Sequence, residues 1–362
     1  MNKELILGFQ EQITHDLRSL YAGFGYTQYK MSKFEEYDLY AKNKDFLISD
    51  QVITFMDIGG KLMALKPDVT LSIVKNTKDL PDTVQKLYYT ENIYRVAKGS
   101  GSFREMMQVG LECIGEIDAY CLSEVLSLAI QSLGAVSEQY VLNISHLGLL
   151  TRILDVLGVS KTSRDDILKA IGEKNFHDLS RLCLDCGMTE KNASLLISIV
   201  KLTGAPGAVL EKLEELISVA QLQDEIQPLK TVFSLLPGNL LDSVRMDFSV
   251  VDDLHYYNGI VFKGFVSGVP SSVLSGGQYD KLMRKMNRKS NAVGFAVYMD
   301  ALNLLDNAVK PYDVDVLISY GQCSNLSEVS DMAAKLRREG NSVMVQKGIP
   351  AGLRYGQLVE IV

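Results

Sequence analysis

A short flexible loop between two strand-like runs is the feature that most constrains this fold. The runs cover residues 87–96 and 106–114, and the glycine- and serine-rich loop Lys98–Ser102 lies between them. Parallel strands need a crossover of a dozen or more residues, so this short connection predicts an antiparallel hairpin.

Other stretches predict more of this sheet and a set of helices. Strand-like runs at 52–56 and 62–65 flank Gly59-Gly60, a favoured turn pair, and predict a second hairpin. Apolar residues at three- and four-residue spacing dominate 147–236, which predicts a mostly helical insertion. An antiparallel sheet combined with helices is an α+β fold.

The last part of the chain has a different pattern. An apolar run at 314–319, a helical pattern at 327–338 and an apolar run at 343–346 make one β-α-β unit. We therefore expect two domains, a core over residues 1–310 and a short α/β segment over 311–362.

The charge balance argues against a nucleic-acid partner. The 362 residues carry 37 Lys and Arg against 44 Asp and Glu, a formal net charge of −7, and the isoelectric point is near 5.3. Proteins that grip tRNA normally carry a basic excess, so tRNA binding is not expected. Residues 281–289 contain five cations and no acid, and we interpret them as a solvated helix face.

Membrane insertion and export are not expected either. No window offers the roughly 20 uninterrupted apolar residues of a membrane helix. Glu4, Glu11 and Asp16 make the N-terminal stretch unlike a secretory signal. Five cysteines, an odd number, fit a reducing compartment, so we expect a cytoplasmic location.

Cys183 and Cys186 have the spacing of a zinc or redox pair. Tetrahedral zinc needs four ligands, and the sequence has no second such pair or neighbouring His-x-x-x-His. Because residues 176–188 have a helical pattern, we interpret the two thiols as structural. The glycine-rich phosphate loops and the HExxH motif are absent from the sequence, so we expect no metal and no cofactor.

Asp68 and Thr70 are the first candidate binding residues. They lie in Pro67-Asp-Val-Thr70, a turn that follows a strand-like run. An anion and a hydroxyl on the same side of a turn suit an ammonium or hydroxyl ligand. The alternative is that one of them caps a helix, which Asp and Thr do routinely.

The long hairpin provides the second candidate group. Gln108, Gly110 and Glu112 alternate by two and therefore share one face of a pleated strand, with Arg95 on the partner strand. A glutamate and a glutamine that face an arginine suit an amino acid, because the carboxylate can hold its ammonium group and the arginine a carboxylate or phosphate. The alternative is a polar stripe that faces solvent.

Tyrosines provide the third group. Tyr256 and Tyr257 precede a strand-like run, and Tyr279 follows Gly276-Gly277, which permits a close backbone approach. Buried tyrosine hydroxyls need partners, which favours a pocket for a flat polar ring over a simple apolar core.

In this order, the three groups resemble the catalytic core of class II aminoacyl-tRNA synthetases, specifically histidyl-tRNA synthetases, over about Phe9 to Leu305. Pro67-Asp-Val-Thr70 resembles their Pro-Glu-Gly-Thr segment, and Tyr94 to Gly115 resembles their second motif. The resemblance continues through His255-Tyr-Tyr-Asn258 and Ser275–Asp280, similar to their histidine-pocket signatures, and through Val293–Ala296, which leads into their third motif.

Three departures from this pattern concern the nucleotide. Asp252 stands where the synthetases carry a catalytic arginine, and Ala301 stands where their third motif has an arginine for the ATP phosphates. Ala97 replaces a glutamate in the second motif. Phosphoryl chemistry depends on positioned cations, so we expect synthetase activity to be lost.

This profile is similar to that of the regulatory subunits of ATP phosphoribosyltransferase, which are paralogues of histidyl-tRNA synthetase. The resemblance implies a non-catalytic subunit for the first step of histidine biosynthesis, with a short-form catalytic subunit as partner and histidine as effector. It also implies a homodimer, formed through about residues 24–60, within a cytoplasmic hetero-oligomer, and a truncated anticodon-binding-like segment after residue 310. The histidine-binding residues it implies are Asp68, Thr70, Arg95, Gln108, Glu112, Tyr256, Tyr257 and Tyr279.

Two other functions stay open from the sequence. One is a divergent ligase that activates histidine or another acid with ATP, against which Asp252 and Ala301 argue. The other is an RNA-binding relic of a synthetase, against which the acidic balance argues.

Overall fold

The chain forms two compact units, a larger one over Ile13–Asn303 and a smaller one that includes Leu304–Val362. A computed structural model describes residues 8–47, 51–96, 101–216, 223–251, 256–305, 312–322 and 325–361. The expected domain boundary between residues 310 and 311 lies outside these described residues.

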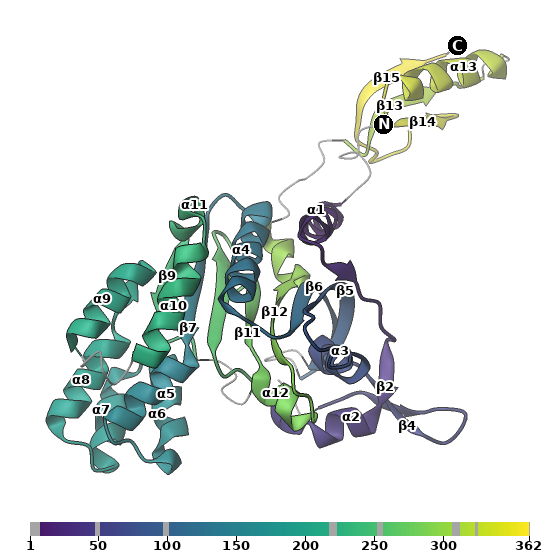
Figure 1. Cartoon of the computed structure of the whole chain (residues 1–362). Helices are drawn as coiled ribbons and strands as arrows, with labels where there is room; N and C mark the ends of the chain where they lie inside the picture. Colours follow the sequence, from purple (N-terminus) through teal and green to yellow (C-terminus); the bar gives the residue numbers. More distant parts are fainter. Residues whose placement is uncertain are drawn as a thin grey trace. The chain divides into compact units, whose positions relative to one another are not determined.

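A nine-stranded sheet organises the larger unit (Figure 1). Its strands are Thr27–Gln28 (β1), Gln85–Val96 (β5), Phe103–Gly115 (β6), Tyr140–His146 (β7), Thr203–Gly204 (β8), Val244–Asp247 (β9), Ile260–Val266 (β10), Leu274–Gln278 (β11) and Asn291–Tyr298 (β12). They follow the order β1-β5-β6-β12-β11-β10-β7-β9-β8, and neighbours are antiparallel except in the β1/β5 and β7/β9 pairs. The predicted long hairpin is β5-β6, so the expected antiparallel-rich α+β fold is confirmed.

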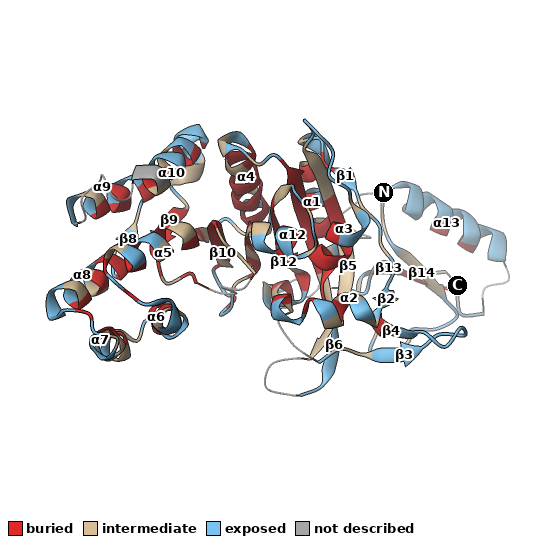
Figure 2. Ribbon diagram, turned by 60° about the horizontal axis from the view of Figure 1, so that its bottom comes forward, coloured by how far each residue is buried: buried red, intermediate tan, exposed pale blue. Residues whose placement is uncertain are grey.

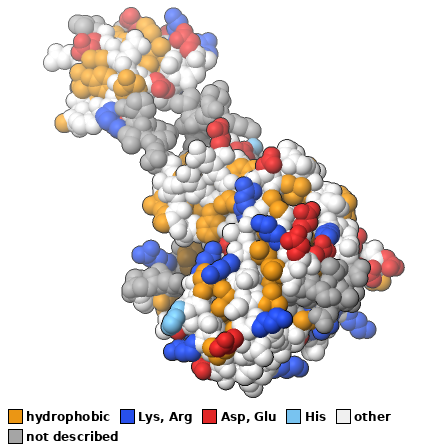
Figure 3. All heavy atoms as spheres, turned by 90° about the vertical axis from the view of Figure 1, so that its left-hand side faces the viewer, with side chains coloured by type: hydrophobic (Ala, Val, Ile, Leu, Met, Phe, Trp, Pro, Cys, Tyr) orange, Lys and Arg blue, Asp and Glu red, His pale blue; other side chains and the backbone are white. Residues whose placement is uncertain are grey.

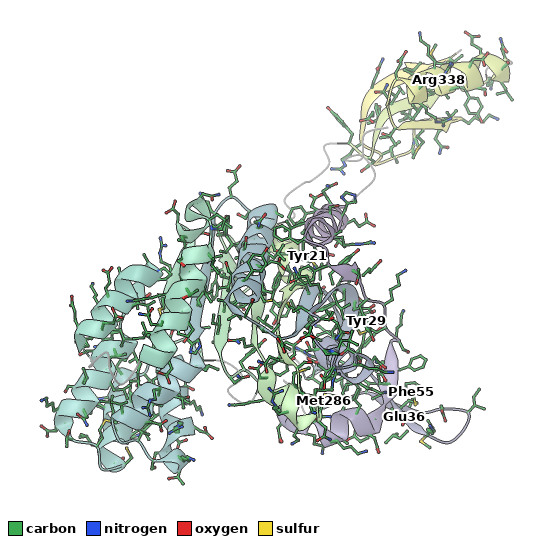
Figure 4. All side chains as sticks on the ribbon, viewed as in Figure 1. Tyr21, Tyr29, Glu36, Phe55, Met286 and Arg338 are labelled. Carbon is green, nitrogen blue, oxygen red and sulfur yellow. The ribbon has the colours of Figure 1, made fainter. Side chains whose placement is uncertain are left out.

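Each face of the sheet is covered by helices. On one face lie α1 (Phe9–Gly23) and α4 (Ala119–Val136), where the hydroxyl of Tyr21, labelled in Figure 4, lies 3.0 Å from that of Ser132. The buried cluster of Tyr89, Leu71 and Leu282 joins β5 to α3 (Val69–Asn76) and α12 (Asp280–Lys285). Figure 2 shows that the buried residues concentrate in the sheet and on the helix sides that face it.

A small antiparallel sheet precedes α3. Its strands are Phe34–Glu36 (β2), Thr54–Met56 (β3) and Leu62–Leu65 (β4), in the order β2-β4-β3. The predicted second hairpin is β3-β4, and Gly60 in its turn has a φ of +78°, a conformation that favours glycine. An α-helix, Tyr37–Lys42 (α2), and a 3-10 turn, Lys44–Phe46 (η2), follow β2.

The predicted helical insertion consists mainly of helices. They are Leu147–Val156 (α5), Arg164–Gly172 (α6), Phe176–Asp185 (α7), Glu190–Val200 (α8), Pro206–Leu216 (α9) and Gln223–Leu235 (α10), followed by Gly238–Leu241 (α11). A 3-10 turn at Lys161–Ser163 (η3) and the short strand β8 interrupt them. Side chains cap several of these helices, as where His146 accepts the amide N–H of Leu149 at 2.8 Å.

Within the described residues, one helix is long and apolar enough to cross a membrane by length and composition alone, namely α4. Most of it is buried in the protein, with Val125, Leu128 and Ile130 fully shielded from solvent. Burial of this kind is typical of the core helix of a globular unit.

The smaller unit contains a three-stranded parallel sheet with the order β14-β13-β15. Its elements are Val314–Ser319 (β13), Leu326–Arg338 (α13), Val343–Gln346 (β14) and Tyr355–Glu360 (β15). The sequence pattern predicted the first three and missed β15. Met299–Leu305 (η5) forms a 3-10 helix that follows β12.

Candidate functional site

One pocket on the α3 side of the large sheet collects all eight predicted binding residues. Including its open mouth, the empty space measures about 550 Å³. The eight are Asp68, Thr70, Arg95, Gln108, Glu112, Tyr256, Tyr257 and Tyr279. They come from the start of α3, from β5 and β6, and from the residues that flank β10 and β11, so the pocket exists only when the sheet is folded.

Asp68 performs two tasks at the start of α3. One carboxylate oxygen accepts the amide N–H of Leu71 at 2.8 Å, which caps the helix, and the other lies 3.2 Å from the guanidinium of Arg95. Arg95 also donates its Nε–H to the carbonyl of Pro67 at 2.5 Å. The capping alternative from the sequence is thus confirmed, and Arg95 is bound to protein groups rather than pointed freely at a ligand.

The pleat of β6 places Gln108, Gly110 and Glu112 on the pocket side, as their spacing predicted. Glycines on this side leave the space that larger side chains need. A Cβ at Gly110 would lie 2.5 Å from the hydroxyl of Tyr89, and one at Gly294 would lie 1.9 Å from Oε2 of Glu112. Both values are far inside normal contact distances, so these positions have room only for glycine.

Glu112 lies at the centre of a hydrogen-bond network. Its side chain is 2% exposed. The hydroxyl of Thr70 donates to Oε1 at 2.7 Å and the hydroxyl of Tyr279 donates to Oε2 at 2.5 Å. Burial raises the pKa of Glu112 to about 8, the two hydroxyl donors oppose that rise, and the negative charge of Asp68 adds to it.

Aromatic rings form the opposite wall. The ring of Tyr256 lies 4.8 Å from that of Tyr257, 5.8 Å from that of Tyr279 and 6.1 Å from that of Phe46, measured between ring centres. Burial raises the pKa of Tyr256 and of Tyr279 well above the ordinary value, so both hydroxyls are neutral. The wall is apolar on its faces and carries hydroxyl groups at its edges, which suits a flat polar ring.

Eight of the sixteen lining residues were not predicted as binding residues from the sequence, and three of these are instructive. Phe46 comes from η2, which has no periodic signal. Tyr89 lies within the predicted β5 run, where nothing marked it. Gly294 lies in Val293–Ala296, one of the segments that resemble the synthetases. Its role in leaving space for Glu112 depends on the pairing of these two residues between β12 and β6, which the sequence does not show.

The remaining candidates lie apart from this pocket. Cys183 and Cys186 lie on and just after α7, with the thiol of Cys186 3.1 Å from the carbonyl of Cys183. The described residues contain no group of three or more His, Cys, Asp or Glu that could hold a metal.

The interpretation of residues 281–289 as a solvated face is wrong for Arg288. The side chain of Arg288 is 11% exposed, and its guanidinium donates to the carbonyls of Val74 at 2.6 Å and Thr77 at 2.8 Å. Helical spacing could not reveal this contact, because Arg288 lies beyond the end of α12 and reaches a segment more than 200 residues away.

Of the sequence departures from the synthetase pattern, Ala301 lies in η5. Asp252, His255 and Ala97 lie outside the described residues.

Comparison with known protein families assigns the chain that forms this pocket. The histidyl-tRNA synthetase family profile matches residues 8–302. The chain belongs to the histidyl-tRNA synthetase family. That match covers every one of the eight predicted binding residues, and it confirms the class II resemblance derived from the motifs.

Relatives within the family carry two different names. An ATP phosphoribosyltransferase regulatory subunit of Oceanobacillus iheyensis is 25% identical over 92% of this chain and 84% of its own length. A histidine–tRNA ligase of Methanocaldococcus jannaschii is 27% identical over 92% of this chain and 81% of its own length. A solved structure from Bacillus halodurans, titled ATP phosphoribosyltransferase regulatory subunit/histidyl-tRNA synthetase, covers 98% of this chain and 94% of its own, with a TM-score of 0.79 and 22% identity. The likeness to the regulatory subunits is thereby confirmed.

Proposed function

We propose that this chain is a regulatory subunit of ATP phosphoribosyltransferase that binds histidine in the pocket around Glu112. The observation that carries the proposal is a division within the site. The groups suited to an amino acid converge in one pocket, whereas the cations suited to a nucleotide are replaced or already bound to protein groups.

The amino-acid half of the site is well formed. Glu112 would accept the ammonium group, with Gln108 and Thr70 as hydrogen-bond partners around it. The tyrosine wall of Tyr256 and Tyr257 would enclose the imidazole. Tyr279 would contact both the imidazole wall and the ammonium-binding carboxylate, because its ring packs on Tyr256 and its hydroxyl donates to Glu112.

The nucleotide half has lost two of the arginines that the synthetases carry. Asp252 and Ala301 stand at positions where synthetases carry arginines. Arg95, the arginine that the second motif retains, donates to Pro67 and contacts Asp68. Stabilising the charge that develops on a phosphoryl group needs donors aimed at it in advance. An ionised aspartate and an alanine have no side-chain donor, and Arg95 already binds protein groups.

The proposed subunit would also form a dimer with a second copy of the chain. Exposed apolar side chains gather at the small sheet and its turn, where Phe34 and Phe55 pack edge-to-face at 5.6 Å. We call this the small-sheet patch; its members are Phe34, Phe55, Met56, Ile58 and Leu62. Figure 4 labels Phe55 beside Glu36 in this region. The patch lies mostly within the expected dimer segment 24–60, and large exposed apolar patches mark interaction sites.

The competing function is a synthetase-like ligase, which the Methanocaldococcus relative favours by its name. An RNA-binding role has less support. On the face shown in Figure 3, Lys and Arg side chains are separated by apolar and acidic ones and form no continuous basic surface among the residues drawn in colour.

The deciding experiment mixes this chain with a short-form ATP phosphoribosyltransferase catalytic subunit that is nearly inactive alone. We expect activity to appear on mixing and to fall when millimolar histidine is added. A confirmed complex with no change in rate would contradict the proposal. Histidine-dependent pyrophosphate exchange by the chain alone would establish the ligase function instead.

A further inference from the structure

The side chain of Glu112 is buried, and the part of the chain that the structure describes provides no cation paired with it. Among the described residues, no Lys, Arg or His forms an ion pair or hydrogen bond with its carboxyl group, and its partners are the hydroxyls of Thr70 and Tyr279. Isolated buried carboxylates are costly, and such a group normally gains a positive partner or takes up a proton.

The titratable and charged groups that surround Glu112 within the described ranges offer no such partner. The start of α3 contributes Asp68, an anion that makes a second negative charge less favourable. Strand β5 contributes Tyr89 and Arg95. Arg95 already binds the carboxylate of Asp68 and the carbonyl of Pro67. The tyrosine wall contributes Tyr256, Tyr257 and Tyr279, and β12 contributes Tyr298 and the uncharged Gly294.

The tyrosines cannot supply the missing positive charge, because a phenol is either neutral or anionic. Burial raises the pKa of Tyr89, Tyr256 and Tyr279 well above the ordinary value, so they stay neutral near pH 7 and add no further negative charge. They can nevertheless adapt to either state of Glu112, because a hydroxyl both donates and accepts a hydrogen bond. A neutral Glu112 can donate its own proton to one of its two hydroxyl partners, and an ionised Glu112 accepts from both.

We propose that the empty pocket holds Glu112 in its protonated form and that an amino acid's ammonium group binds in exchange for that proton. The inference rests on the proposed histidine-binding function and specifies how binding is regulated. On binding, the O–H bond of Glu112 breaks, its proton leaves to solvent, and the carboxylate accepts an N–H of the ligand's ammonium. The ligand thus supplies the positive partner that the described residues do not provide.

This exchange makes ligand affinity depend on pH. Below the pKa of Glu112 in the empty pocket, which burial places at about 8, each bound ammonium displaces about one proton. Histidine affinity should therefore increase about fivefold from pH 7.0 to 8.0, over which the imidazole of free histidine is already mostly neutral. An analogue without the amino group, imidazolepropionate, should release no proton when it binds.

The test is calorimetric titration of histidine into the full-length protein, alone and with its catalytic subunit, in buffers of different ionisation enthalpy. We expect close to one proton released per histidine at pH 7.0, and a flat pH profile with no release for Glu112→Gln. The infrared band of a protonated carboxyl group should be present in the empty wild-type protein at neutral pH and decrease when histidine is added.

The outcomes separate the two proposals. Histidine binding without proton release and with constant affinity from pH 7.0 to 8.0 would overturn the exchange and leave the histidine-binding function standing. No histidine binding, alone or in the complex, would overturn both. The proton count on the wild-type protein needs no variant, so the test holds even if Glu112→Gln fails to fold.

Discussion

Gly294 and Glu112 lie opposite each other in the β6-β12 pair, and a Cβ at position 294 would lie 1.9 Å from Oε2 of Glu112. The carbonyl oxygen of Leu111 would lie 2.5 Å from the same Cβ. The position of the carboxyl group in the pocket therefore depends on the absence of a side chain on the neighbouring strand.

Replacing this glycine tests that dependence. Gly294→Ala should displace the Glu112 carboxyl group, weaken histidine binding at least tenfold and lower the free energy of unfolding by about 1–3 kcal/mol, as overpacking typically does. Calorimetry and chemical denaturation measure the two effects. Gly207→Ala is the control, because a Cβ there would meet open space in α9, and it should leave binding unchanged. Normal histidine binding by Gly294→Ala would contradict the assigned pocket.

Removing the carboxyl group should abolish feedback by histidine. Losing one partner of a buried charge-assisted pair costs about 2–5 kcal/mol in binding, or at least roughly thirtyfold in affinity. Glu112→Ala should therefore eliminate inhibition at millimolar histidine while activation of the catalytic subunit is retained. Inhibition assays of the mixed complex measure both, with exposed Glu116→Ala as control. If Glu112→Ala retains normal inhibition, the effector binds elsewhere.

The small-sheet patch should mediate self-association. We expect the chain alone to sediment as a homodimer at micromolar concentration, and the double variant Phe55→Asp, Met56→Asp to sediment as a monomer, because it places charges among exposed apolar side chains. Leu326→Asp, which alters an exposed leucine of the smaller unit, should remain a dimer. A stable wild-type monomer would count against the assembly.

Arg288 should contribute strongly to stability. Its guanidinium satisfies the carbonyls of Val74 and Thr77 and lies 3.1 Å from the carboxylate of Asp79. Arg288→Ala leaves these groups unpaired and should lower the free energy of unfolding by about 2–4 kcal/mol. Lys289→Ala removes a neighbouring exposed cation and should change it little. Equal effects of the two variants in urea denaturation would refute this role.

The same contacts predict acid sensitivity. Hydrogen bonds from the backbone of Lys289 and from Ser290, with a smaller effect of Arg288, hold the pKa of Asp79 well below its usual value of 3.8. A lowered pKa in the folded state means that the ionised form stabilises the fold above about pH 4 and that this contribution is lost as the pH falls further. Unfolding free energies measured from pH 5 to pH 2 should fall less steeply for Asp79→Asn than for the wild-type protein.

Local patterns predicted much of the site. Alternation along β6 predicted that Gln108 and Glu112 share a face, and the turn at Pro67 predicted the cap formed by Asp68. These features depend on residues close together in the sequence. The clustering of tyrosines predicted an aromatic wall, and the class II resemblance added the expectation that all eight residues form one histidine site.

Contacts between distant segments could not be predicted in the same way. The clearance at Gly294 depends on the register between β6 and β12, and the role of Arg288 depends on a loop more than 200 residues away. Strand β15 was missed because apolar and polar residues alternate only weakly over Tyr355–Glu360. Its parallel pairing with β13 also cannot be predicted from its own residues.

The partners of Glu112 lie far along the chain, with Thr70 at a separation of 42 residues and Tyr279 at 167. During synthesis, the N-terminal part of the core leaves the ribosome long before Tyr279 and β12 do. Under the proposed function, a nascent chain could not bind histidine until nearly the whole larger unit had emerged and paired its strands. Bound histidine would then mark a completed core, and free histidine would favour finished chains over partly folded ones by mass action.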